Sequence, residues 1–331
     1  MTHGNLQILL AERPDGWVDE SNFKINDAPI PRPAEGQVLA RIRWLSLDPY
    51  MRSRMDEASY GETVAVGGVM IGGTVGEIVE SKHPKFKEGD VVVGYGGWQQ
   101  YAVSDGSGLM KIPPLGIPEQ AFLGVVGMPG ITGWYGLMKI GNPKEGETVV
   151  VSAASGAVGS VVGQLARIKG CRAVGIAGGK TKCDYVVNDL GFDACIDYKQ
   201  PDFYKLLKTA TPKGIDIYFE NVGGEILDAV LKRLNAGARI PLCGLISGYN
   251  GEPIPIKNPF ALLTSRAHLQ GFIISDHLDL WPEAIKELGG YVAAGKIKYR
   301  ETITEGIENA PRAFIGLLKG ENFGKQLIKV S

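Results

Sequence analysis

The segment from Val150 to Ser160, VVSAASGAVGS, constrains the fold more than any other part of the chain. A run of β-branched residues breaks into small residues, and apolar residues then recur at helical spacing over 158–168. This pattern predicts a strand, a tight turn and a helix, which is the setting of a dinucleotide-binding motif. On the Gly-x-Gly-x-x-Gly template its positions are Ala154, Gly156 and Gly159, so alanine replaces the first glycine.

The two remaining glycines have separate expected roles. Gly156 would let the backbone approach a pyrophosphate, and Gly159 would let the helix pack close to the strand. The helix N-terminus would add unpaired N–H groups and a partial positive charge. A glycine-rich turn that binds no ligand is the alternative interpretation.

Charge and cysteine content narrow the class of partner. The net charge of −1 argues against a general nucleic-acid or membrane-surface binder, and favours small-molecule partners. No apolar run approaches the ~20 residues that span a bilayer. The four cysteines are scattered, as is typical of free thiols in a reducing compartment, so we expect a cytoplasmic protein.

Short β-like runs separated by glycine and proline dominate the first 120 residues. They are Gln37 to Trp44, Val75 to Glu80, Val91 to Tyr95 and Gln99 to Val103. Such spacing predicts a compact β-rich domain of barrel or sandwich type. The last thirty residues are expected to form a helix and a final strand that rejoin it, which gives a domain of residues 1–123 and 299–331.

Strand and helix patterns alternate over residues 124–298. The expected strands are Thr148 to Ala153, Arg172 to Ala177, Ala194 to Asp197, Ile215 to Glu220, Ala238 to Cys243 and Leu269 to Ile274. Six alternating strands predict an α/β, doubly wound parallel sheet of the Rossmann type. The stretch from Ser247 to Ser265 is expected to be an irregular insert before the last strand.

The end of the second strand carries information about the cofactor. NAD-binding folds place a carboxylate there, to bind the adenosine ribose. Here the strand ends in Gly178 and Gly179, with Lys180 and Lys182 directly after. Lysines and glycines provide the positive charge and the room that the extra phosphate of NADP requires, which favours NADP(H). Two solvated lysines at the start of a surface helix are the alternative.

Two common reductase sites are missing from the sequence. A catalytic zinc site needs clustered cysteine or histidine ligands, but no cysteine precedes Cys171, so we expect no metal. A Ser-Tyr-x-x-x-Lys arrangement is also lacking. A reaction that develops only modest enolate charge is therefore more plausible than alcohol oxidation.

Seven segments, in order, carry a resemblance to a known family. They are LSLDPYMR at Leu45 to Arg52, MPGITGWYGL at Met128 to Leu137, SAASGAVGSVVGQLARIKGCRAVGIAGG at Ser152 to Gly179, LGFDACIDYK at Leu190 to Lys199, YFENVGG at Tyr218 to Gly224, CGLISGYN at Cys243 to Asn250 and LLKGENFGKQLIKV at Leu317 to Val330. In these the chain resembles the zinc-independent medium-chain dehydrogenases/reductases, specifically the prostaglandin reductase group with the alkenal and curcumin reductases. That resemblance implies a Rossmann NADP-binding domain and a β-rich, GroES-like catalytic domain.

The resemblance also implies a set of cofactor-binding residues. Ser155, Gly156, Ala157 and Val158 would hold the pyrophosphate, with Gly159 behind them. Lys182 would meet the ribose phosphate, with Gly178 and Tyr198 beside the adenosine. The rest of the groove would be lined by Thr132 near the nicotinamide, Asn221, Cys243, Gly244, Leu245, Ile246, Ser247, Tyr249, Phe272, Ile273, Ile274 and Asn322.

The activity implied by the resemblance is NADPH-dependent reduction of a carbon–carbon double bond conjugated to a carbonyl. Tyr249, just beyond the fifth strand, is the first candidate for a hydroxyl that assists the carbonyl oxygen, and Tyr50 is the second. Either tyrosine could instead be a wall of the pocket. A quinone oxidoreductase of the same superfamily and a non-catalytic NADPH-binding protein are the alternative functions.

Two further expectations concern the surface. An apolar edge strand over Leu269 to Ile274 would be a liability if left unpaired, which predicts a homodimer through the edge of the Rossmann sheet. The insert from Gly251 to Ser265 is expected to form part of the substrate wall. It matches relatives poorly, and the choice among enals, enones, prostanoid-like lipids and diarylheptanoids stays open.

Overall fold

The computed structural model describes residues 4–251 and 254–331 and divides into two compact units. One unit contains residues 1–124 and 301–331, and the other contains residues 125–300. The first is therefore built from both ends of the chain. The second is a continuous segment, and it contains the glycine-rich turn.

A six-stranded parallel sheet forms the centre of the second unit. Its strands are β8 (Thr148–Ser152), β9 (Arg172–Ala177), β10 (Ala194–Asp197), β11 (Ile215–Phe219), β12 (Leu234–Leu242) and β13 (His268–Gly271). The spatial order β10-β9-β8-β11-β12-β13 is the 3-2-1-4-5-6 order of the Rossmann fold. The predicted fold class is confirmed.

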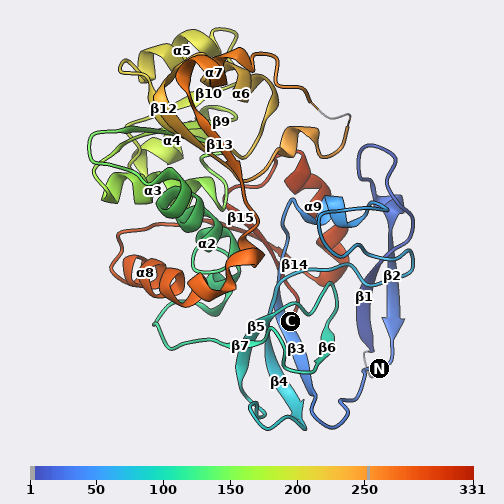
Figure 1. Ribbon diagram of the computed structural model, residues 1–331. Coiled ribbons are helices and arrows are strands. Elements are labelled where there is room, and N and C mark those ends of the chain that lie inside the picture. The colour runs from blue at the N-terminus through green and yellow to red at the C-terminus, as the bar shows by residue number, and fades with distance from the viewer. Residues whose placement is uncertain (1–3, 252–253) are drawn as a thin grey trace. The chain divides into compact units, whose positions relative to one another are not determined.

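Helices alternate with these strands, and the ribbon in Figure 1 follows the alternation from green to orange. They are α2 (Met128–Tyr135), α3 (Gly159–Ile168), α4 (Lys180–Asn188), α5 (Phe203–Ala210), α6 (Gly224–Leu231), α7 (Phe260–Ser265) and α8 (Trp281–Ala293). In α3 the apolar side chains at helical spacing, Val161, Val162 and Leu165, are all buried. The helix packs against β8 and β9, as the amphipathic pattern predicts.

The first unit is β-rich, as expected. Its strands are β1 (Asn5–Leu10), β2 (Phe23–Ala28), β3 (Val38–Ser46), β4 (Thr74–Ser81), β5 (Val91–Gly94), β6 (Tyr101–Ser104), β7 (Met110–Lys111), β14 (Glu301–Glu305) and β15 (Lys325–Lys329), and its helices are α1 (Met51–Arg54) and α9 (Ala310–Leu318). The main sheet has the order β14-β15-β3-β4-β5-β7, with β6 also paired to β3. The final strand therefore lies inside this sheet, between the edge strand β14 and β3.

A buried ion pair joins the two chain segments of the first unit. The Lys325 ammonium donates to the Asp48 carboxylate at 2.8 Å and to the Leu47 carbonyl at 2.6 Å. Ser46 also donates to Asp48, and both charged side chains are at most 8% exposed. Burial lowers the pKa of Lys325, and the nearby Asp48 charge opposes that shift. A lysine this deeply buried is tolerated only because it is paired.

Three sequence expectations differ from the structure in the second unit. Strand β13 ends at Gly271, because Phe272 leaves the sheet to pack against Tyr135 and Phe219. Strand β12 begins at Leu234, earlier than expected, since its pairing with β11 contains a register shift and Gly237 adopts a left-handed φ of 75°. The predicted insert is not irregular throughout, because its end forms α7; residues 252–253 of it lie outside the described residues.

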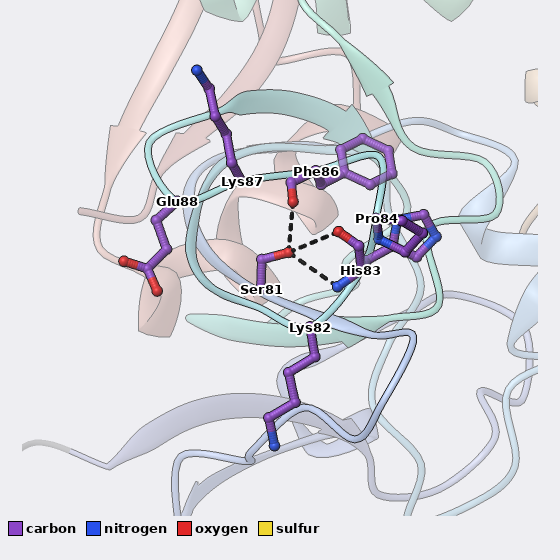
Figure 2. A pocket seen from close by; sticks show the side chains of 7 residues that line it. All are labelled: Ser81, Lys82, His83, Pro84, Phe86, Lys87 and Glu88. Atoms are coloured by element: carbon purple, nitrogen blue, oxygen red, sulfur yellow. Dashed lines mark hydrogen bonds between the residues drawn. The ribbon is translucent and has the colours of Figure 1, made fainter.

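The lining of a surface hollow in the first unit contains none of the predicted site residues. Figure 2 shows its lining, which is Ser81, Lys82, His83, Pro84, Phe86, Lys87 and Glu88. The Ser81 hydroxyl donates to the Phe86 carbonyl at 2.7 Å and accepts from the His83 amide at 3.2 Å. The hollow is therefore the inside of a turn between β4 and β5. In the described parts of the chain, no helix is both long and apolar enough to cross a membrane.

Candidate functional site

The glycine-rich turn between β8 and α3 is held by short backbone hydrogen bonds. Ala153 adopts a left-handed φ of 50°, which reverses the chain at the end of β8. The Gly156 amide donates to the Ala153 carbonyl at 2.9 Å, and the Ser160 amide donates to the Gly156 carbonyl at 3.0 Å. Ser155, Ala157 and Val158 complete the turn. The predicted strand, turn and helix are therefore present, and the N-terminus of α3 lies beside the turn.

Gly159 is the glycine that this turn requires most. A Cβ on Gly159 would lie 2.4 Å from the Ala153 carbonyl oxygen, which is backbone and has no easy way to move. A Cβ on Gly156 would meet the same oxygen at 3.1 Å, a much milder contact. The close approach of helix to strand thus depends on Gly159, while a Cβ on Gly156 would meet no other atom within 4 Å.

The missing first glycine has a structural compensation on the neighbouring strand. The Ala154 side chain is fully buried and points toward β9. Its methyl group lies 2.8 Å from the position that a Cβ on Gly175 would take. Because Gly175 of β9 has no side chain, it leaves room for the Ala154 methyl group, so Ala154 does not disrupt the turn.

The carboxyl end of β9 gathers the residues predicted to surround the adenosine. A Cβ on Gly178 would lie 3.0 Å from Tyr198 Cε1 and 3.3 Å from Lys199 Cε, so only glycine leaves space there. The Asp197 carboxylate fixes this corner by accepting from the amides of Gly179 at 2.8 Å and Lys199 at 3.1 Å. Tyr198 is 44% exposed, in keeping with a surface that could cover a ligand.

Two ammonium groups face the same corner. Burial lowers the pKa of Lys182, and the positive charge of Lys199 lowers it further. Lys199 was not among the predicted site residues, because it follows β10 and not β9. By contrast, Lys180 is 86% exposed at its side chain and pairs with Asp184 at 2.5 Å. An anion placed near Lys182 and Lys199 would relieve the repulsion between them.

Asn221 and the segment from Cys243 to Ser247 lie together at the ends of β11 and β12. The side-chain amide of Asn221 donates to the Ser152 carbonyl at 2.8 Å, and the backbone carbonyl of Asn221 accepts from the Ile246 amide at 3.2 Å. The Ser247 amide donates to the Val222 carbonyl at 3.1 Å. Hydrogen bonds between the loop after β11 and the loop after β12 therefore hold the predicted groove residues of both loops in place. Gly244 and Leu245 directly precede Ile246 in this segment.

Glu220 is the centre of this arrangement, although the sequence reasoning did not select it. The side chain is fully buried, and one carboxyl oxygen accepts from the Ser152 hydroxyl at 2.9 Å and from the Val222 and Gly223 amides at 2.6 and 3.0 Å. Its backbone carbonyl accepts from the amides of Cys243 and Gly244. Burial raises the pKa of Glu220 despite these donors. The residue thus ties the ends of three strands together.

Tyr249 lies just beyond the short 3-10 helix Ile246–Gly248, on the loop after β12. Its hydroxyl oxygen accepts from the Leu245 amide at 3.4 Å and would lie 3.0 Å from a Cβ on Gly244. The ring therefore folds back over its own loop, above the backbone that Glu220 holds. A hydroxyl can accept one hydrogen bond while it donates its proton to another oxygen.

The remaining predicted residues of the second unit surround α2. The Thr132 hydroxyl donates to the Met128 carbonyl at 2.7 Å and is largely buried. Phe272 lies 5.3 Å from the Tyr135 ring, and Ile274 begins the 3-10 helix Ile274–Leu280. Ile274 is buried, while Ile273 is 37% exposed.

Tyr50 and Asn322 belong to the first unit. Tyr50 precedes α1, and the Arg54 guanidinium lies 5.6 Å from its ring centre. Burial raises the pKa of the Tyr50 hydroxyl well above its usual range, and the charge of Asp48 adds to the shift. Tyr50 therefore keeps its proton and can serve as a hydrogen-bond donor. The Asn322 side chain donates to the Gly324 carbonyl at 2.7 Å.

Comparison with protein families matches both units. Residues 6–112 match the N-terminal domain of oxidoreductase, and residues 157–289 match the zinc-binding dehydrogenase family. In the described residues, no group of three or more His, Cys, Asp or Glu side chains is arranged to hold a metal ion.

Known proteins are similar over the whole chain. The NADPH-dependent curcumin reductase of Escherichia coli is 52% identical, covering 99% of this chain and 97% of that protein. The NADP(+)-dependent 2-alkenal reductase of Nicotiana tabacum is 43% identical, covering 99% and 98%. The crystal structure of CurA from Vibrio vulnificus in complex with NADPH is 50% identical and has a TM-score of 0.94, covering 98% of this chain and 99% of that one.

Proposed function

Because the chain belongs to the zinc-independent medium-chain dehydrogenase/reductase family of curcumin, 2-alkenal and prostaglandin reductases, we propose that it uses NADPH to reduce the carbon–carbon double bond of α,β-unsaturated aldehydes and ketones. The observation that carries this proposal is the similarity along nearly the whole chain to reductases of that kind. The local geometry agrees with this proposal. The glycine-rich turn, the two lysines Lys182 and Lys199, and the loop of Tyr249 all follow the carboxyl ends of parallel strands.

The residues present fit NADPH. The N-terminus of α3, opened by Gly156 and Gly159, suits a pyrophosphate. Lys182 and Lys199 face a corner where Gly178 leaves space, and this suits the ribose phosphate. Asn221 and the loop from Cys243 to Ser247 would line the path toward the nicotinamide.

When bound, NADPH supplies a hydride to the β-carbon of the substrate. The protein's part is to hold the carbonyl oxygen where negative charge develops as the enolate forms. A hydroxyl donor placed at that oxygen stabilises the charge, and we assign this role to Tyr249, with Tyr50 as the second candidate. Water would then protonate the α-carbon.

The proposal is tested by following the absorbance of the reduced cofactor with a panel of enals, enones and 1,4-quinones, each with NADPH and with NADH. We expect turnover of enals or enones with NADPH and little with NADH. Turnover of quinones alone would indicate a quinone oxidoreductase instead. NADPH binding without turnover of any acceptor would indicate a binding protein, and either result would reject the reductase proposal.

Replacing Lys182 by alanine is expected to raise the Kd for NADPH by at least about tenfold and to leave the Kd for NADH nearly unchanged. The reason is that a charge-assisted hydrogen bond to phosphate contributes about 1.5–3 kcal/mol, and only NADPH has the extra phosphate. Fluorescence titration with each cofactor measures both constants.

The matched control is Lys180→Ala, which removes an exposed lysine two positions away that pairs with Asp184. We expect it to change neither constant by more than about twofold, as for an exposed ion pair. An equal loss of NADPH and NADH affinity in Lys182→Ala would contradict the assignment of Lys182 to the phosphate.

The predicted homodimer and cytoplasmic location stay predictions. Strand β13 is the edge of the sheet, and all four of its residues are exposed. The strand is, however, shorter and more polar than the apolar edge that the sequence suggested, with His268 and Gln270 in it. Pairing with a second copy would still satisfy its open edge.

A further inference from the structure

Two of the four cysteines meet between α4 and β10. Cys183 lies in the first half of α4 and Cys195 in β10, and their thiols form a hydrogen bond with each other. The Cys195 side chain points toward the helix. A Cβ built on Gly175 would lie 3.2 Å from the Cys195 sulfur and 2.9 Å from Val186 of α4, so the sulfur and the helix lie on the same side of the sheet. The helix packs on both β9 and β10. The two sulfurs are therefore held together by the fold.

The four thiols differ in reactivity. The hydrogen bond between Cys183 and Cys195 lowers the pKa of Cys183 and raises that of Cys195, whereas burial raises the pKa of Cys171 to about 11 and that of Cys243 to about 12. The thiolate is the form that reacts with oxidants, so Cys183 is the preferred target. Cys183 and Cys195 are also only half-buried, within reach of a small solute.

The pair lies directly behind the proposed phosphate corner. Cys183 follows Lys182 on the helix, and Cys195 precedes Asp197, whose carboxylate fixes the amides of Gly179 and Lys199. A disulfide has a sulfur–sulfur distance of about 2.05 Å, shorter than any contact between two thiols. Forming it would draw the first turns of α4 toward β10 and would displace Lys182 relative to Lys199.

We propose that Cys183 and Cys195 form a reversible disulfide that weakens binding of the nicotinamide cofactor. The cofactor part of this inference rests on the proposed function, while the disulfide itself does not. It makes the α4–β10 contact a modification site, with a peroxide as the oxidant.

The chemistry balances with one peroxide molecule. The Cys183 thiolate attacks a peroxide oxygen, a sulfur–oxygen bond forms, the oxygen–oxygen bond breaks, and hydroxide leaves and takes a proton to become water. The Cys195 sulfur then attacks the sulfenic sulfur, the sulfur–sulfur bond forms, the sulfur–oxygen bond breaks, and the departing hydroxide takes the Cys195 proton and leaves as a second water. Two thiols are oxidised and the peroxide is reduced. A dithiol reductant reverses the reaction.

The test uses the full chain treated with hydrogen peroxide, followed by alkylation and peptide mass spectrometry. We expect a linked peptide pair that contains Cys183 and Cys195, and its loss after dithiothreitol. Titration of the oxidised protein with NADPH should give a Kd about tenfold higher, the loss expected if Lys182 no longer reaches the phosphate. The reduced protein should recover its original Kd.

Matched variants separate the possible outcomes. Cys183→Ser and Cys195→Ser should each keep the Kd of the reduced protein and become insensitive to peroxide, whereas Cys171→Ser should respond like the parent chain. Absence of the linked peptides, or a peroxide effect that survives in Cys183→Ser, would overturn the proposal, as would a disulfide that leaves the Kd unchanged. If the reduced protein binds no NADPH, the proposed function fails, while the linked peptides still report on the disulfide.

Discussion

Replacing Lys325 by methionine is expected to lower the free energy of unfolding of the first unit by about 3–5 kcal/mol, the cost of leaving one partner of a buried ion pair without the other. Methionine matches the unbranched stem of lysine up to Cε and lacks only the ammonium group, so the lost charge dominates the effect. Asp48 would lose the ammonium group that pairs with it, and the Leu47 carbonyl would lose a donor. Urea unfolding followed by tryptophan fluorescence measures the loss, because Trp98 is buried in the core of this unit.

The control is the double variant Lys325→Met with Asp48→Asn, which removes both charges and keeps an acceptor for Ser46. We expect it to recover most of the lost stability, since a buried ion pair replaced by neutral groups is often close to neutral. The coupling between the two substitutions follows from the double-mutant cycle. A single variant that loses less than about 1 kcal/mol would show that Asp48 does not need the lysine.

Replacing Tyr249 by phenylalanine should lower kcat about 100-fold, the usual effect of removing one donor from a developing oxyanion. The ring stays, so the shape of the loop is preserved. The Kd for NADPH should change by less than about twofold, because the lost contact with the Leu245 amide is long, at 3.4 Å. Turnover of several enones under NADPH saturation, together with a binding titration, measures both quantities.

Tyr50→Phe is the companion variant, since Tyr50 is the second candidate for the hydroxyl donor and its raised pKa keeps the hydroxyl protonated. We expect it to lower kcat less than Tyr249→Phe does. If Tyr249→Phe keeps full turnover across the panel, Tyr249 is a wall of the pocket and the donor role is wrong. If only the Tyr50 variant loses turnover, the order of the two candidates is reversed.

The sequence was sufficient to predict the parallel sheet, because the patterns that indicate its strands and helices are local in the chain. β-branched runs such as Val149 to Val151, followed by an amphipathic helix, can be recognised without knowledge of the rest of the fold. The number of such units then leaves few possible strand orders. The predicted limits of β9 and β10 agree with the structure to the residue.

The contacts around Glu220 could not be predicted in the same way. A glutamate at the end of a strand is usually solvated, and its burial arises from three strand ends that meet only in the folded sheet. Lys199 was missed for a similar reason, because its distance from Lys182 depends on the parallel pairing of β9 and β10. Its position after an apolar strand and next to Tyr198 was the only available signal.

The sequence-based limits of β13 were wrong because the apolar residues after Gly271 were assumed to belong to the strand. Phe272 and Ile274 are apolar and buried or partly buried, yet they serve contacts outside the sheet, with Tyr135 and within the next helix. Hydrophobic pattern alone does not distinguish a residue that pairs in a sheet from one that leaves it to fill the core.

The position of β15 has a consequence for the order in which the protein is made. The strand lies between β14 and β3, and Lys325 meets Asp48 across 277 positions of the chain. During synthesis β3 emerges early and is followed by its neighbours β4 and β6, but its third neighbour, β15, emerges only after the second unit. The continuous second unit has all of its strands before then. The first unit, which begins before the second unit in the chain, is thus completed after it, and until β15 is made Trp44–Ser46 of β3 lack that partner strand and Asp48 lacks its cation.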